Sequence, residues 1–172
     1  STLFVNNLNT ASGSTIQVAS GKTIHQPGAI LQTVTTELSQ SDGALGTITS
    51  ASFTELTALR CTITPKLTGS KIYYRSSIHC GNNHTGGSWY STRLQVAGSV
   101  ISENSFYANE QYDMIMNHTF HEGIDPNTTT AGQARRYDSF FRGGTAVPFK
   151  FNWPAGNSLK SKCVITLMEI AQ

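Results

Sequence analysis

Residues 70–80 read SKIYYRSSIHC, and apolar side chains alternate with polar ones along this stretch. The two sets are Ile72, Tyr74, Ile78 and Cys80 against Lys71, Arg75 and His79. Successive side chains of a β-strand point to opposite faces of its sheet, so the pattern predicts a strand with one buried and one hydrated face. Such half-buried strands are typical of antiparallel sheets that cover a core on one side.

The same kind of pattern recurs along the rest of the chain. Short runs rich in Val, Ile, Thr, Tyr and Phe are separated by clusters of Gly, Asn, Ser and Pro, without a sustained helical period. One run ends before Gly98-Ser99, a pair suited to a two-residue hairpin turn. Another run places Phe120 on an apolar face and His121 in water. From residue 29 onward we expect about eight to ten strands, which form an all-β, jelly-roll-like antiparallel β-sandwich.

Residues 1–28 differ in character from the rest. They are small, β-prone and nearly free of charge, and they supply too few large side chains for a core of their own. Pro27-Gly28 marks a boundary. We therefore expect two parts, an extended N-terminal attachment segment (residues 1–28) and a β-sandwich head (residues 29–172). The segment needs a partner surface, which we expect it to contact through Leu3, Phe4, Val5, Leu8, Ile16 and Val18.

The composition excludes several classes of function. The chain has 172 residues and a mass of 18.6 kDa, which suits one domain with a short appendage. Its net charge is +2, and apart from Arg135-Arg136 the basic residues are scattered, so we expect no nucleic-acid partner. The sequence contains no apolar run of membrane-spanning length and does not start like a secretory signal. We expect a soluble protein without membrane insertion that, unless a leader has already been removed, is not secreted by that route.

The three cysteines, Cys61, Cys80 and Cys163, each have apolar neighbours at strand spacing. Three thiols cannot all pair within one chain. Free cysteine behaves as a small hydrophobic residue, so we expect buried thiols rather than a disulfide. This expectation fits assembly in a reducing cytoplasm.

Residues 162–172 read KCVITLMEIAQ, and as a strand this stretch is apolar on both faces. Two explanations are open: the strand is central and covered by loops, or its outer face packs against another copy of the chain. We favour the second. The subunit interface is then expected to include Val164, Leu167, Met168 and Ile170.

The motifs indicate no catalytic, metal or cofactor site. The chain lacks the Gly-x-Ser-x-Gly elbow of hydrolases, a P-loop and a dinucleotide fingerprint. His118 and His121 are three residues apart, so on a strand they point to opposite faces and do not share an ion. The stretch from Asp125 to Thr130 is only superficially like a calcium loop, because it lacks the Gly and the distal Glu. We therefore expect a non-enzymatic protein without metal or cofactor.

Aromatic side chains in or beside polar, Gly- and Asn-rich segments are the remaining candidates for ligand contact. Aromatic stacking together with short polar side chains suits adhesion to carbohydrate or protein. The same aromatics also suit a purely structural role, in which they anchor loops onto the core. The candidates are Trp89, Tyr90, Tyr107, Tyr112 and Trp153.

Short stretches at both ends and in the middle form a recognisable set: residues 1–16, Cys61–Lys66, Ser70–Ile72, Asp125–Thr129 and Ile165–Ala171. Together they resemble small virion structural proteins of marine bacteriophages, particularly the tail-fibre-like proteins of cyanophages. The resemblance implies a trimeric jelly roll of the tumour-necrosis-factor and complement type, whose C-terminal strand lies near the three-fold axis. It also implies that residues 1–28 attach the trimer to the particle.

The sequence therefore leads us to expect a non-enzymatic virion structural protein. We expect a homotrimeric fibre or knob that is assembled in the host cytoplasm, displayed on the particle exterior and involved in host attachment. Its partners would be itself, other virion proteins of the tail or capsid, and a glycan or protein of the host surface. The alternative is a capsid decoration protein that stabilises the shell. A third reading is an enzyme that depolymerises surface polysaccharide. Such an enzyme needs a pair of catalytic carboxylates, and the spacing of Asp and Glu in the sequence does not exclude such a pair.

Overall fold

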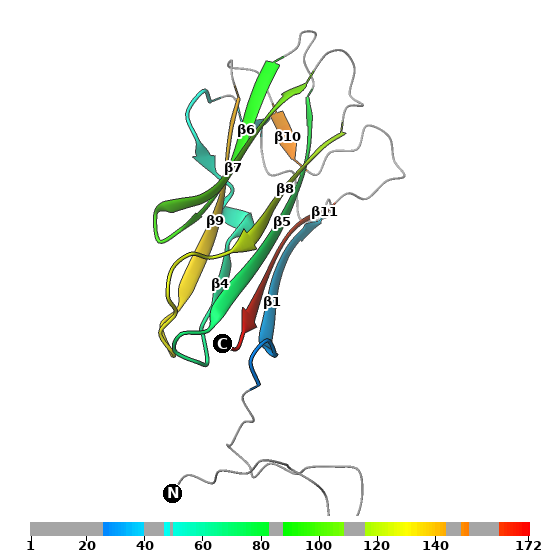
Figure 1. Cartoon of the computed structure of the whole chain (residues 1–172). Coiled ribbons are helices and arrows are strands. Elements are labelled where there is room, and N and C mark those ends of the chain that lie inside the picture. Colours follow the sequence, from blue (N-terminus) through cyan, green and yellow to red (C-terminus); the bar gives the residue numbers. More distant parts are fainter. Residues whose placement is uncertain are drawn as a thin grey trace, which may run out of the picture.

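The computed structural model describes residues 26–39, 47–48, 50–82, 88–108, 116–143, 149–151 and 162–172. These residues form an all-β, jelly-roll-like sandwich of two antiparallel sheets, as the sequence predicts (Figure 1). The described residues contain eleven strands and one short 3-10 helix, η2 (Thr57–Leu59). No helix among them has the length and apolar character that crossing a membrane requires.

The first sheet, sheet A, contains the strand that begins the sandwich and the strand that ends it. Its order is β1-β11-β5-β10-β2, and β8 pairs with β5. The strands are β1 (Ile30–Ser39), β2 (Thr47–Ile48), β5 (Lys71–Asn82), β8 (Met116–Ile124), β10 (Phe149–Phe151) and β11 (Lys162–Ile170).

The second sheet, sheet B, packs across the core from sheet A. Its order is β3-β9-β6-β7, and β4 pairs with β9. The strands are β3 (Thr54–Glu55), β4 (Cys61–Ile63), β6 (Ser88–Val96), β7 (Ser99–Ala108) and β9 (Arg135–Gly143).

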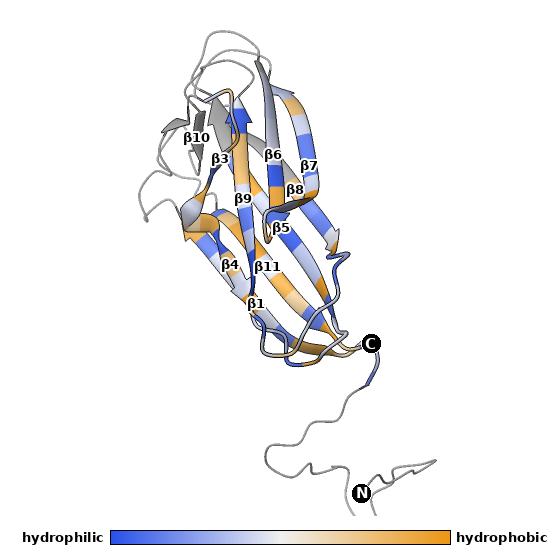
Figure 2. Cartoon of the chain, turned by 90° about the vertical axis from the view of Figure 1, so that its left-hand side faces the viewer, coloured by the Kyte–Doolittle hydropathy of each residue, from blue (hydrophilic) through white to orange (hydrophobic). Residues whose placement is uncertain are grey.

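Strand β5 has the two faces that its sequence predicts. Ile72 and Ile78 are fully buried and Tyr74 is nearly so, whereas Arg75 is exposed. Figure 2 shows the resulting bands of opposite hydropathy along the strands. Burial of the apolar side chains from both sheets supplies the main free energy of folding. Among the described residues, the core consists of Leu38, Leu56, Leu59, Cys61, Ile63, Ile72, Tyr74, Ile78, Tyr90, Leu94, Val96, Tyr137, Phe141, Cys163, Ile165 and Leu167.

Strand β8 is turned over relative to the prediction. His121 is 1% exposed and lies between the sheets, with its ring nitrogens 2.8 Å from Ser102 Oγ and 2.9 Å from Thr92 Oγ1. Phe120 is 42% exposed on the outer face. The prediction of His121 in water is therefore wrong. Two hydroxyls from sheet B satisfy the imidazole, and a buried polar group with partners for its hydrogen bonds is tolerated.

The hairpin between β6 and β7 turns one residue earlier than predicted. Val96 pairs with Ser99, so the two loop residues are Ala97 and Gly98 rather than Gly98 and Ser99. Both have positive φ, 48° at Ala97 and 81° at Gly98. This combination defines the type I′ turn, whose twist matches that of the flanking strands.

Strand β11 buries one face completely and the other by half. Cys163, Ile165 and Leu167 are fully buried in the core, and Val164 and Met168 on the outer face are half-buried. Leu167 is therefore wrong as an interface residue, because its side chain points between the sheets and no partner reaches it. Val164, Met168 and Ile170 remain as the outer-face members of that set.

The cysteine expectation is confirmed where the side chains are described. Cys61 and Cys163 are free and buried, with exposures of 1% and 0%. Each belongs to the core cluster, in which a thiol packs like a small apolar side chain. The side chain of Cys80 lies outside the described residues.

The chain enters the sandwich beside the end of β11. Gly28, at φ 84°, donates its N–H to the carbonyl of Ala171 at 2.8 Å, and Ala171 donates to the carbonyl of Ala29 at 2.9 Å. Strand β1 then begins at Ile30. The contact residues expected in the attachment segment, Leu3, Phe4, Val5, Leu8, Ile16 and Val18, lie outside the described residues.

Candidate functional site

The outer face of sheet A carries a group of exposed apolar side chains in the described part of the head. The register aligns Met168 beside Tyr73 and Tyr73 beside Ile124. Ile124 is 55% exposed, and Ile30, which pairs with Ile170 at the edge of the face, is 59% exposed. We call this surface the sheet A outer face. Its apolar members are Ile30, Tyr73, Phe120, Ile124, Val164, Met168 and Ile170.

A band of polar groups crosses this face between its apolar rows. Arg75 Nε lies 4.0 Å from Glu122 Oε2, and its guanidinium carbon lies 5.7 Å from the centroid of the Phe120 ring. The Tyr73 hydroxyl donates to Glu122. The charges of this band are thus partnered within the face. Beside it, Val164 helps to line a hollow of about 290 Å³ together with Arg75 and Phe120.

The outer face of sheet B combines ion pairs with exposed apolar side chains. Arg93 donates to Glu103 at 2.7 and 3.0 Å, and its guanidinium lies 3.7 Å from the centroid of the Phe53 ring. The guanidinium of Arg142 lies 4.6 Å from the same centroid. Two cations thereby cover Phe53, and their charged groups face water above the ring.

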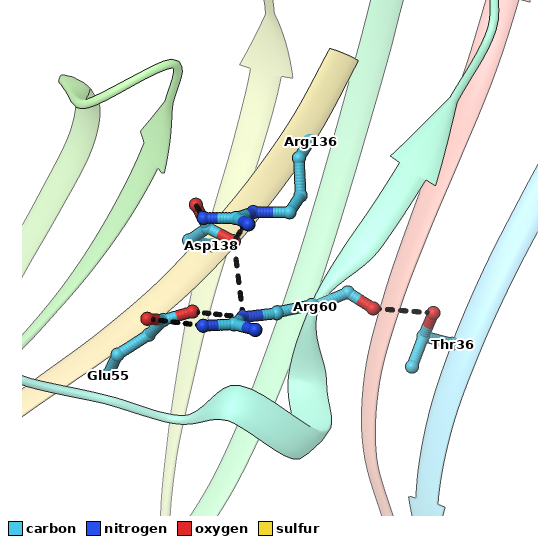
Figure 3. A network of polar contacts seen from close by, with 5 residues as sticks. All are labelled: Thr36, Glu55, Arg60, Arg136 and Asp138. Carbon is cyan, nitrogen blue, oxygen red and sulfur yellow. Dashed lines mark hydrogen bonds and ion pairs between the residues drawn. The ribbon is translucent and has the colours of Figure 1, made fainter. Parts of the chain in front are cut away.

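A second group of charges continues this face toward β1 (Figure 3). Arg60 donates to Glu55 at 2.5 and 2.9 Å, and Arg136 donates to Asp138 at 2.7 and 3.0 Å. The hydrogen bond from Arg60 lowers the pKa of Glu55. Thr36 donates to the main-chain carbonyl of Arg60 at 2.9 Å, which links this network to sheet A. This part of the sheet B face therefore carries paired charges that suit contact with water.

Two of the aromatic ligand candidates form an exposed pair on this face, at one end of β6 and β7. Trp89 is 62% exposed and Tyr107 is 49% exposed, and their ring centroids are 5.3 Å apart in an edge-to-face arrangement. Tyr90 is wrong as a contact candidate. It is 1% exposed, and its ring stacks on Phe106 and Phe141 at 5.6 and 5.9 Å. Tyr112 and Trp153 lie outside the described residues.

Sequence reasoning missed Glu169, a fully buried carboxylate on the inner face of β11. Its oxygens accept hydrogen bonds from the backbone N–H groups of Lys66 and Leu67 at 2.9 Å. Ser70 Oγ and Gln32 Nε2 donate to it at 2.8 and 2.7 Å. Burial alone would raise the pKa of Glu169, but these hydrogen bonds outweigh burial and lower it. The signal in the sequence that could have revealed this buried carboxylate is an acidic residue within an otherwise apolar strand.

The stretch after β8 is held by a second buried carboxylate. Asp125 accepts from the Tyr137 hydroxyl at 2.5 Å and from the backbone N–H of Asn127 at 2.9 Å. It also forms an ion pair with Arg135 at 2.8 Å. Burial, followed by this hydrogen bond, raises the pKa of Tyr137 strongly. Asp125 thus fixes a turn, and in the described residues no group of three or more His, Cys, Asp or Glu is placed to hold a metal ion.

Hydroxyl groups link Glu169 to Thr129, which follows the turn that Asp125 fixes. Ser70 Oγ lies 2.9 Å from Thr129 Oγ1, and Thr129 in turn donates to the main-chain carbonyl of Ser70 at 2.7 Å. Four of the stretches that carry the phage resemblance therefore meet at one end of the sandwich: Cys61–Lys66, Ser70–Ile72, Asp125–Thr129 and Ile165–Ala171. Their shared role in this structure is to fix the loops at that end.

Every carboxylate in the described residues has a partner. Glu37 accepts from Lys162 at 2.7 Å, and the others are bound as given above. The set is Glu37, Glu55, Glu103, Glu122, Asp125, Asp138 and Glu169. A glycosidase needs one protonated and one ionised carboxyl group that both face a substrate cleft. In this structure each of the seven described carboxylates is bound by a donor or cation of its own chain.

Comparisons with known proteins bear on the fold. No family model matches the chain, and no curated protein matches it. Among solved structures, it is similar to dimeric latent PorU from Porphyromonas gingivalis, with a TM-score of 0.51 and 10% sequence identity. The match covers 90% of this chain, which spans only 14% of that chain. At this identity the likeness shows the fold alone.

Proposed function

We propose that this protein is a non-enzymatic structural protein of a bacteriophage virion. In this proposal it forms a homotrimeric fibre or knob on the particle exterior and takes part in host attachment. The observation that carries the proposal is the sheet A outer face, on which β1, β5, β8 and β11 all present apolar side chains, several of them well exposed.

Contiguous exposed apolar surface marks contact sites, because leaving it in water costs free energy. On the sheet A outer face, Ile30, Phe120 and Ile124 are each more than 40% exposed. Covering them with a partner would remove that cost. It would also complete the burial of Val164 and Met168, which their own chain buries only by half.

A second copy of the chain is the partner that this face fits best. The face carries both signs of charge, with Lys71 and Arg75 opposed by Glu37 and Glu122. A surface of mixed sign can complement a copy of itself, and cyclic association of identical chains is common. The resemblance to trimeric jelly rolls, in which the C-terminal strand lies near the axis, favours three copies over two.

The phage assignment rests on the resemblance and gains support from the convergence of its motifs. Residues that are far apart in the sequence, such as Lys66, Thr129 and Glu169, meet in one buried network. The chain enters the head at Gly28 beside Ala171, next to the end of β11. An attachment segment formed by residues 1–28 would thus leave the head from the end that these motifs fix.

Solution mass tests the assembly. We expect the purified chain to elute as a trimer of about three times 18.6 kDa by light scattering. Met168→Asp and Ile124→Asp place charges on the sheet A outer face, so we expect folded monomers. Thr62→Asp is the matched control, because Thr62 is exposed on sheet B, and it should remain a trimer. A monomeric parent chain would refute the trimer, and trimeric Met168→Asp and Ile124→Asp variants would refute this interface.

The capsid decoration alternative differs in location. Immunogold labelling of particles distinguishes the two, since a fibre predicts label at the tail and a decoration protein predicts label over the whole shell. The depolymerase reading predicts release of reducing ends from host surface polysaccharide. The paired state of the described carboxylates favours the non-enzymatic proposal over it, and such release by purified protein would overturn that preference.

A further inference from the structure

A groove of about 600 Å³ lies between the β6–β7 hairpin turn and the loop that leads into β9. Its volume falls within the range of about 300–1,000 Å³ that is usual for small-molecule sites. Its lining combines polar and charged side chains with small ones. The residues that matter here are Ala97, Gly98, Gln133, Ala134, Arg136 and Asp138.

The hairpin wall of the groove is fixed by a tight turn. Ala97 adopts φ 48°, although left-handed backbone favours glycine, and Gly98 follows at φ 81°. A residue with a Cβ pays an energetic cost to hold that conformation, so the turn geometry is imposed by the ladder on either side, where Val96 pairs with Ser99. This wall therefore has its shape before any ligand arrives.

The opposite wall is tied to the body of the head. Gly132 donates its N–H to the carbonyl of Pro65 at 2.8 Å, and Ala131 donates to Thr68 Oγ1 at 3.0 Å. Arg135 Nη1 donates to the carbonyl of Thr128 at 2.9 Å. Because both walls are already fixed, ligand binding costs little conformational entropy in the protein.

The charges in the groove are compensated within the protein. Arg136 forms two hydrogen bonds with Asp138, at 2.7 and 3.0 Å, and Arg135 is paired with buried Asp125 at 2.8 Å. A charged ligand would have to compete with these ion pairs. The groove thus presents hydrogen-bond donors and acceptors without a net charge, which favours a neutral polar ligand.

We propose that this groove binds a neutral, hydroxyl-rich ligand, namely an uncharged saccharide. Hydroxyl groups both donate and accept, and the wall offers both functions side by side in Arg136 and Asp138 and within the amide of Gln133. Gly98, which has no side chain, and Ala134, whose side chain is a single methyl group, leave room in the groove for a sugar ring. None of the described lining residues is aromatic, so the ligand is held by hydrogen bonds rather than by stacking.

The site is separate from the proposed subunit interface. Its lining comes from strands of sheet B and the loop before β9, whereas the interface is on the outer face of sheet A. Each subunit of a trimer would keep its own groove, and several weak sites on one particle give avidity. The use of the site in host contact rests on the proposed function, while saccharide binding itself does not.

The test is a titration of the full-length, isotope-labelled chain followed by amide NMR. The probes are maltose, cellobiose, lactose and mannobiose, with sialyllactose as an acidic comparison. We expect at least one neutral disaccharide to shift the amides of Ala97, Gly98 and Gln133. In Ala134→Trp, whose indole would fill the groove, we expect this shift to be lost. The matched control is Ala51→Trp, because Ala51 is exposed and lies outside the groove.

Each outcome decides the proposal. Shifts that are confined to the groove, lost in Ala134→Trp and kept in Ala51→Trp establish the site. An absence of shifts with all four neutral probes, shifts with sialyllactose alone, or shifts that persist in Ala134→Trp overturn it. None of these results changes the solution mass, so failure of the groove and failure of the trimer remain distinguishable.

Discussion

Gly123 lies directly opposite Tyr74 in the β5–β8 ladder, and the Tyr74 ring occupies the space that a side chain at position 123 would need. A Cβ there would be 2.7 Å from Tyr74 Oη and 3.0 Å from Cζ. The same hydroxyl lies 3.4 Å from the carbonyl of Ile101 in sheet B, to which it donates. The missing side chain of Gly123 therefore lets Tyr74 reach from one sheet to the other.

We expect Gly123→Ala to destabilise the head by about 1–3 kcal/mol, because the buried ring of Tyr74 has little room to move. Urea unfolding followed by far-UV circular dichroism measures the change. Combining it with Tyr74→Phe removes the nearest atom and should recover part of the loss, so the two effects should not add. An alanine variant as stable as the parent would contradict this close approach.

Burial makes the stability of the head depend on pH through His121. Desolvation lowers the pKa of His121 to about 4, and nearby Glu103 opposes this only in part. The unfolded chain binds a proton near pH 6.5, whereas the folded chain does not. The stability from neutral His121 is thus fully present above about pH 6.5 and is lost as the pH falls toward 4, with a slope of up to about 1.4 kcal/mol per pH unit.

Unfolding free energies measured between pH 7 and pH 5 test this dependence. Over this window, Glu55 and Glu169 remain ionised in the folded chain, because hydrogen bonding lowers the pKa of each below the ordinary 4.5. His79, whose pKa is also lowered by burial, contributes with the same sign. His121→Gln should therefore flatten the profile without removing its slope entirely. An identical slope in this variant would rule out His121 as the cause.

The buried carboxylate of Glu169 predicts a large effect for a small change. Glu169→Gln keeps the shape but replaces one acceptor oxygen by a donor, which would face the N–H groups of Lys66 or Leu67. We expect a loss of roughly 2–3 kcal/mol in the free energy of unfolding. Glu37→Gln is the matched control, because its ion pair with Lys162 is about half exposed and should cost less than about 1 kcal/mol. Equal effects of the two changes would contradict the structural role of Glu169.

Trp89 and Tyr90 are neighbours in the sequence, but we expect their replacement by alanine to affect the stability of the head very differently. Tyr90→Ala removes a ring stacked between Phe106 and Phe141 and should cost about 3–5 kcal/mol. Trp89→Ala removes an exposed ring that pairs with Tyr107 and should cost no more than about 1 kcal/mol. Thermal unfolding of the two variants under identical conditions makes the comparison. A larger loss in Trp89→Ala would show that Trp89 serves the fold rather than contact with a ligand.

Removing residues 1–25, which form most of the attachment segment, should leave the head intact. A chain that starts at Gln26 keeps the hydrogen bond from Ala29 to the Gln26 carbonyl and the one from Gly28 to Ala171. We expect this chain to fold and to form the same trimer as the full chain, but to be missing from assembled particles. Solution mass and the protein content of purified particles provide the two measurements. Normal incorporation would contradict the role of residues 1–28 in attachment.

The fold class could be predicted from the sequence because several strands have one wholly apolar face. Ile72 and Ile78 in β5, and Leu94 and Val96 in β6, alternate with polar residues, and all four are buried. The turn after β6 was misplaced by one residue because the pattern Gly-Ser suggested one turn type, while the ladder register selects another. Local pattern alone does not fix strand register.

Buried polar residues were beyond prediction because their partners are distant in sequence. Thr92 and Ser102, which satisfy His121, lie 29 and 19 residues away from it, and Lys66 lies 103 residues away from Glu169. The same holds for the proposed interface. The sequence of β11 revealed its apolar outer face, but only the pairing of the strands brings Tyr73 and Ile124 onto that face.

The link between Gly28 and Ala171 has a mechanical consequence. A pull applied through residue 28 acts on the end of the β1–β11 ladder, where the pairs starting at Ile30 and Ile170 would open one after another. Such peeling needs little force, because the hydrogen bonds do not share the strain. The resistance of a tethered head to mechanical unfolding would therefore depend on contacts that hold the outer face of sheet A. Assembly through that face would hold β1 and β11 in place under force as well as stabilise the fold.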